Sequence, residues 1–175
     1  RDGLLHAVEV KAFWHRQEEG QRQRRVGSVV TQEFRDTVDT LGGRTEFGIG
    51  PMGGHHAVAG AEVHEDRVRS LGWGADSNYP GGSRQGALGV FLLDQWSPVE
   101  SWRLTAGTRW SLDWVDSMIR GGAAPGPLAE TYSSWTGGGS VARRTHGDHW
   151  HWLGAWQGFR PPNLNETVAL KSGPS

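Results

Sequence analysis

Histidines near the carboxyl-terminal end are the residues whose spacing could hold a metal ion. His146, His149 and His151 lie within six positions of one another, and imidazole is the commonest protein ligand of transition metals. On a strand, His149 and His151 would project from the same face, as two ligands of one ion must. Asp148 would point the other way, so no carboxylate completes the set. We therefore predict no metal site; His149 and His151 are the two residues to inspect, and solvated imidazoles are the alternative.

The patterns that mark common catalytic sites do not occur in the sequence. Two glycine-rich stretches, residues 81–83 and 137–140, lack the lysine and the helical pattern that follow a phosphate-binding loop. A nucleophile elbow, paired carboxylates and a zinc-protease helix are also missing. The chain has no cysteine, which excludes thiol catalysis and disulfide bonds. We predict neither an enzymatic activity nor a bound cofactor.

The charges are balanced. Lys and Arg number 18 and Asp and Glu 19, giving a net charge of −1, and such a chain generates no field that would attract nucleic acid. Arg22, Arg24 and Arg25 form a local basic cluster, but Glu18 and Glu19 adjoin it. That mixture is typical of a solvated loop. We predict no nucleic-acid partner.

The clearest structural element runs from Trp102 to Trp114. Apolar residues and tryptophans occupy every second position, and arginine, serine and aspartate occupy most of the positions between them. A period of two predicts a β-strand whose faces meet different environments, such as lipid and a hydrated lumen. No run of about 18 apolar residues occurs, which excludes a transmembrane helix. The mean hydropathy of −0.57 does not exclude a transmembrane barrel, because its strands alternate.

Six further segments alternate in a similar way, although the fourth is apolar on both sides and the sixth is rich in glycine. The seventh places Trp150, Trp152 and Trp156 on one face. We therefore predict an all-β antiparallel meander of about seven strands. Its segments lie at residues 6–15, 40–50, 57–66, 87–96, 102–114, 135–143 and 149–157.

Short and long connections alternate between these segments. Residues 51–54, 97–100 and 144–147 are short and rich in turn residues, whereas residues 17–39, 70–84 and 116–134 are long and polar. Bacterial outer-membrane barrels have this asymmetry, with short turns on the periplasmic side and long loops outside. Tryptophans add two belts, Trp96, Trp102 and Trp150 near the short turns and Trp14 and Trp114 at the other end. A soluble tryptophan-rich β-sandwich that binds glycans stays open as the alternative.

Residues 158–166 read Gly-Phe-Arg-Pro-Pro-Asn-Leu-Asn-Glu. This stretch resembles the Gly-Phe-Arg-Ala-Pro-x-Leu-x-Glu segment of TonB-dependent outer-membrane receptors, with Pro161 in place of the usual alanine. Residues 60–68 resemble the Gly-x-Glu-x-x-x-Asp strand of the same family, and residues 89–96 with 105–110 resemble its Gly-x-Phe-x-Gln-Asp-x-Trp hairpin. The similarity extends from about Val38 to Glu166.

The resemblance implies a receptor in the bacterial outer membrane that imports a ferric siderophore, haem or a similar large scarce nutrient. It also implies a barrel of about 22 strands, whose outer surface faces lipid and whose inner surface faces the lumen. An N-terminal plug would close this barrel, and the TonB complex would supply the energy for import. Seven strands cannot close such a barrel, so we expect residues 1–175 to be a partial barrel domain, without plug or signal peptide. The family-motif loop comprises Phe159, Arg160, Pro161, Pro162 and Asn163. In the haem subgroup a Phe-Arg-Ala-Pro box precedes a ligand histidine, and that box would map onto residues 159–162; a rigid loop entry after a strand is the alternative for the two prolines.

Overall fold

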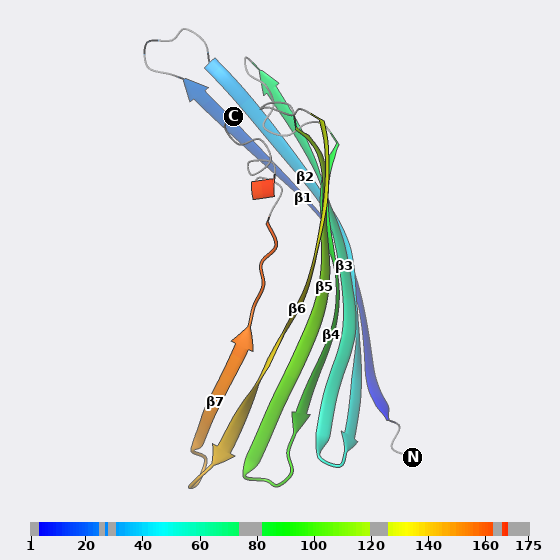
Figure 1. The fold of residues 1–175 in the computed structure, drawn as a ribbon, viewed down its shortest axis with the longest axis vertical. Coiled ribbons are helices and arrows are strands. Elements are labelled where there is room, and N and C mark those ends of the chain that lie inside the picture. The colour runs from blue at the N-terminus through cyan, green and yellow to red at the C-terminus, as the bar shows by residue number, and fades with distance from the viewer. Residues whose placement is uncertain are drawn as a thin grey trace.

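The computed structural model describes residues 4–24, 27, 31–73, 82–119, 126–162 and 166–167. These residues form one sheet of seven antiparallel strands in sequence order, which confirms the predicted meander. Figure 1 shows the sheet bent along its length, with the segment after the last strand running on the concave side. The strands are β1 Leu5–Arg24, β2 Thr31–Met52, β3 His55–Trp73, β4 Ser83–Trp96, β5 Trp102–Ile119, β6 Gly126–Arg144 and β7 Trp150–Gln157.

The strands are longer than a bilayer requires. A transmembrane strand needs about 9–11 residues, whereas β2 has 22 and β1 has 20. Much of what the sequence predicted as long loops is strand, since the β1–β2 ladder continues to the pair Arg24 and Thr31. The predicted solvated loop around the basic cluster is therefore wrong for Arg22 and Arg24, which lie in β1, while Arg25 falls outside the described residues. Backbone pairing thus persists where the alternation of polar and apolar residues in the sequence is no longer regular.

The register of the ladders assigns every strand residue to one of two faces. We call the face with Glu62, Arg109 and Asp113 the inner face, because the segment after β7 lies on that side and shares a pocket with Asp113. The other is the outer face. Trp110 lies opposite Val90 of β4 and Trp135 of β6, and all three belong to the outer face. The alternation predicted for β5 is therefore confirmed.

Short turns join the strands at one end of the sheet. Gly53 and Gly54 form the β2–β3 turn with φ values of 59° and 82°, a backbone conformation that glycine adopts without the strain that a side chain would add. Residues 97–101 and 145–149 make the other two turns. The strand ends that the other three connections join lie at the opposite end of the sheet (Figure 1). The predicted segregation of connections to two ends is confirmed.

Two facings could be decided only by the structure. In β4, Val90 and Leu92 belong to the outer face, while Phe91 and Leu93 belong to the inner face. In β7 the three tryptophans belong to the inner face, because Trp150 pairs with Arg144 and Trp152 with Ala142. The expectation that Trp150 joins an outer tryptophan belt is therefore wrong. The face of each β7 residue follows from the register of β7 against β6, and the apolar residues of β7 alone do not predict it.

The described residues form no second layer. Among the residues that the structure describes, the buried apolar side chains are Val68, Val115 and Leu128, and Val38 packs against the first two. A sandwich would bury the facing sides of two sheets, whereas here large apolar residues such as Val10 and Trp135 are 71% and 66% exposed on the outer face. The described part of the chain is thus a single curved wall, and the sandwich alternative is not formed. It contains no helix long and apolar enough to cross a bilayer.

Candidate functional site

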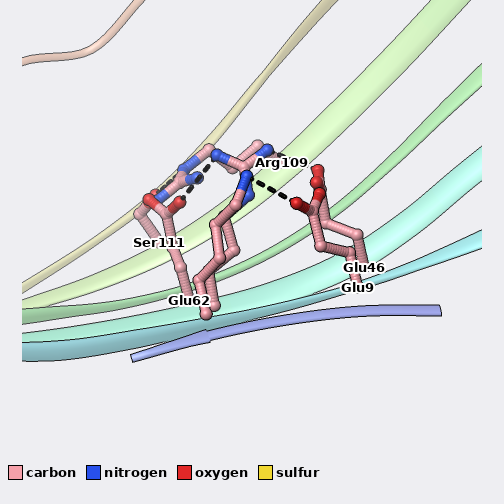
Figure 2. A network of polar contacts seen from close by, with 7 residues as sticks. Glu9, Glu46, Glu62, Arg109 and Ser111 are labelled. Carbon is pink, nitrogen blue, oxygen red and sulfur yellow. Dashed lines mark hydrogen bonds and ion pairs between the residues drawn. The ribbon is translucent and has the colours of Figure 1, made fainter. Parts of the chain in front are cut away.

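Charged side chains of both signs form a continuous band across the inner face of β1 to β5 (Figure 2). Arg44 contacts Glu46 at 2.5 Å and Glu62 at 3.5 Å, and Arg109 contacts Glu62 at 2.6 Å. Arg109 Nε also donates to Ser111 Oγ at 2.9 Å. We call this group the polar belt; its members are Glu9, Lys11, Arg44, Glu46, Glu62, Arg109 and Ser111.

Glycines make this belt possible. Arg109 of β5 reaches Glu62 of β3 across β4, and a Cβ atom at Gly89 would lie 2.1 Å from the Arg109 Nη2 atom. Gly60 leaves similar room for the ring of Phe91, since a Cβ atom there would lie 2.5 Å from the ring Cζ. The guanidinium of Arg44 stacks on that ring at 5.0 Å.

The belt is neither buried nor freely solvated. The side chains of Arg109 and Glu62 are 33% and 29% exposed, and that of Arg44 is 43% exposed. Partly exposed ion pairs suit a wall that borders water, because full burial of such charges would cost several kcal/mol per ion. The charged side chains, held in place by their ion pairs, can bind water and the polar groups of a ligand. It explains why arginine and glutamate alternate with apolar residues along these strands.

The family-motif loop follows β7 and returns over the inner face. Arg160 Nη2 lies 2.7 Å from Glu166 Oε1. Arg160, Pro161 and Pro162 line a pocket of about 210 Å3, whose inner-face walls include His64, Gln85 and Asp113. Of the predicted site residues, Phe159 is 48% exposed and does not line this pocket. Asn163 lies outside the described residues.

Polar groups beside the pocket are fixed by hydrogen bonds. Asp66 accepts from Thr40 Oγ1 at 2.7 Å and from Gln85 Nε2 at 3.0 Å. Asp113 differs, because its Oδ2 atom is buried and has no hydrogen-bond partner among the described residues. The sequence placed His64 and Asp113 on polar faces but gave no signal that the motif loop would reach them. That contact depends on the path of the chain after β7.

The two histidines singled out as metal candidates are not brought together on one strand face. His149 lies in the β6–β7 turn, where its backbone N–H donates to the carbonyl of His146 at 3.2 Å. His151 belongs to β7 and, being paired with Arg143, to the outer face. The described residues contain no group of three or more His, Asp or Glu able to hold a metal ion.

Comparison with known proteins gave one family and one informative structure. The family model described as TonB dependent receptor-like, beta-barrel, matches residues 6–174. Among solved structures, the copper transporter OprC matches with a TM-score of 0.77 and 16% identity, over 93% of this chain and 28% of that one. At that identity the likeness shows the fold alone. No curated protein matches the sequence significantly.

Proposed function

The chain belongs to the family of TonB-dependent receptor-like β-barrels, and on this premise we propose that it forms part of the wall of an outer-membrane transporter. The observation that carries the proposal is the division of one sheet into two unlike faces. Val90, Trp110 and Trp135 meet on the outer face, while one residue away Arg109 joins Glu62 on the inner face. Lipid on one side and water on the other would select this division.

The dimensions of the outer face support a bilayer. Trp102 and Trp114 are twelve residues apart, or about 40 Å along a strand at about 3.3 Å per residue. A tilt near 45° reduces this to a height of about 28 Å, close to the apolar band of outer-membrane barrels. Charged pairs on the outer face lie toward the two ends of this band. Arg16 on Asp39 and Arg67 on Glu65, both at 2.7 Å, lie toward Trp114, and His55 on Asp94 at 2.7 Å lies toward the short turns.

We further propose that residues 1–175 are a partial barrel domain of a longer receptor. The chain spans 28% of the length of the copper transporter that it resembles in fold. Within the described residues, β1 and β7 each pair along one edge only, and such edges require further strands for closure. The remaining strands, the plug and the contact with the TonB complex would then lie outside this chain.

The cargo that we propose is a metal chelate, either a ferric siderophore or haem. The motif loop supports it, because Arg160 and the two prolines stand over a polar pocket on the inner face. A copper transporter among the structural neighbours is in keeping with a metal-containing cargo. Proteins of this class carry their ligands through without chemical change, so the proposal includes no catalytic step and no resident cofactor.

Uptake by the full-length receptor tests the proposal. The receptor would be expressed in a bacterium that lacks its own iron-chelate and haem receptors, with and without a functional TonB complex. We expect TonB-dependent accumulation of radiolabelled ferric siderophore or growth on haemin as the sole iron source. Copper accumulation without either would overturn the iron assignment and retain transport. Cargo uptake that is unaffected by loss of TonB would overturn the mechanism.

A further inference from the structure

Arginines lie over tryptophan rings on both faces at the short-turn end of the sheet. The guanidinium of Arg143 lies over the Trp102 ring at 5.3 Å on the outer face. That of Arg103 lies over the Trp150 ring at 5.2 Å on the inner face. Neither arginine forms an ion pair with a carboxylate among the described residues. Arg143 and Arg103 therefore lie at similar distances from their rings but on opposite sides of the wall. The Trp150 ring also carries Arg144 at 6.0 Å.

The surroundings of Arg143 form two distinct rows on the outer face. Trp102, Arg143 and His151 are paired across β5, β6 and β7. The next outer-face row toward the middle of the sheet consists of Leu104, Val141 and Leu153. Leu153 is 75% exposed. The row with the guanidinium and the indole thus lies next to an apolar row. A phospholipid has the same order, with a charged headgroup next to its acyl chains.

Among the described residues, Arg143 has no carboxylate partner on the outer face. Asp94 is the nearest outer-face carboxylate on β4, and its Oδ2 atom lies 2.7 Å from His55 Nδ1. The ring of His55 in turn stacks on Trp96 at 5.3 Å. Asp94 is thereby paired with His55 through Oδ2, while its Oδ1 atom is buried without a hydrogen-bond partner among the described residues. Neither oxygen forms an ion pair with Arg143.

We propose that Arg143, with Trp102 and His151, binds the headgroup phosphate of an anionic phospholipid in the periplasmic leaflet. The indole fixes the guanidinium plane, and its N–H groups then remain free to donate two parallel hydrogen bonds to a phosphate. Leu104, Val141 and Leu153 contact the acyl chains. This site rests on the proposed function, because it requires the outer face to meet lipid.

Lipid binding by the full-length receptor in mild detergent tests the site. Phosphatidylglycerol would be titrated and bound lipid counted by native mass spectrometry for the wild type, Arg143→Gln and Arg103→Gln. We expect Arg143→Gln to weaken the tightest phosphatidylglycerol site by about tenfold, the effect of losing a charged hydrogen bond. Arg103→Gln should bind as the wild type does, because its stack faces the lumen.

Two results would overturn the site. One is equal phosphatidylglycerol affinity in the two variants, and the other is equal affinity of the wild type for phosphatidylglycerol and phosphatidylcholine. Heat-modifiable mobility on gels, measured on all three proteins, shows whether each has folded as a barrel. Wild-type protein with this mobility shift but no selective lipid site contradicts the inference alone. Wild-type protein that stays in water without detergent and shows no shift contradicts the proposed function, and the lipid site with it.

Discussion

The inner and outer faces of this wall can be compared directly at two neighbouring leucines. Leu92 and Leu93 are adjacent in β4 and are 47% and 40% exposed, yet Leu92 belongs to the outer face and Leu93 to the inner face. Residue type and exposure are thus alike, and the two leucines differ in the face that they occupy, which under the proposed function means in the medium that they meet. Because neither face packs against a second layer in the described part of the chain, we expect the effect of a substitution on stability to depend on whether its face meets lipid or water.

An arginine at each of these two positions gives the largest expected effect. Leu92→Arg places a charge in lipid near the middle of the apolar band and should destabilise the full-length receptor by about 2–4 kcal/mol. Leu93→Arg places the same charge in a hydrated lumen and should cost less than about 1 kcal/mol. Reversible unfolding by urea in lipid vesicles measures both. Equal costs would mean that the two faces meet the same medium, and the membrane assignment would fail.

A methyl group at a glycine on each face gives the next effect. A Cβ atom at Gly89 would lie 2.1 Å from Arg109 Nη2 and force the guanidinium away from Glu62, whereas at Gly43 on the outer face its nearest neighbour is the Lys11 carbonyl oxygen at 3.3 Å. We expect Gly89→Ala to cost about 1 kcal/mol, the loss of a partly exposed ion pair and its hydrogen bond.

Gly43→Ala serves as the matched control and should change the free energy of unfolding by less than about 0.5 kcal/mol. The same urea titration measures both variants. Repeating the titration of Gly89→Ala in the Arg109→Gln background shows whether the cost comes from the displaced guanidinium. If Gly89→Ala remains as costly there, the methyl group disturbs the backbone, and our account of the belt is wrong.

A double-mutant cycle on the belt itself sharpens the comparison further. Arg109→Gln and Glu62→Gln should show a coupling energy of about 0.5–1 kcal/mol, because both side chains are about one-third exposed. Salt in the lumen should screen this coupling, so it should fall between low ionic strength and 1 M salt. A coupling that salt leaves unchanged would show that the belt is sealed from water.

The sequence predicted the faces wherever alternation was complete. In β5 larger apolar residues alternate with mostly polar ones, and the register confirmed the face of each residue from Trp102 to Trp114. In β4 four consecutive apolar residues carry no such signal, so only pairing with β3 and β5 distinguishes Val90 from Phe91. The strand extensions toward the long connections were missed for a related reason. Apolar residues such as Val38 and Leu128 are too sparse there to show a period of two, although backbone pairing continues.

The candidate site was predictable only in part. The motif loop was found through its resemblance to a family, and the structure brings Arg160, Pro161 and Pro162 over the inner face. The contact between Glu62 and Arg109 spans 47 residues and requires a glycine on the intervening strand. No local pattern encodes a contact of that kind, because it depends on the register of three strands together.

The smallest expected effect concerns the motif loop, where the inner face is covered by the chain itself. Arg160 is 74% exposed in its pair with Glu166, so Arg160→Gln should change stability by less than about 0.5 kcal/mol. We nevertheless expect faster proteolysis after β7, because this pair is the ionic tie between residues 160 and 166. Glu166→Gln should act in the same way if the pair is the cause. A stability loss above about 2 kcal/mol in Arg160→Gln alone would instead mean that the closed barrel buries this guanidinium against another partner. The loop would then be packed in the interior of the barrel and not exposed on the inner face.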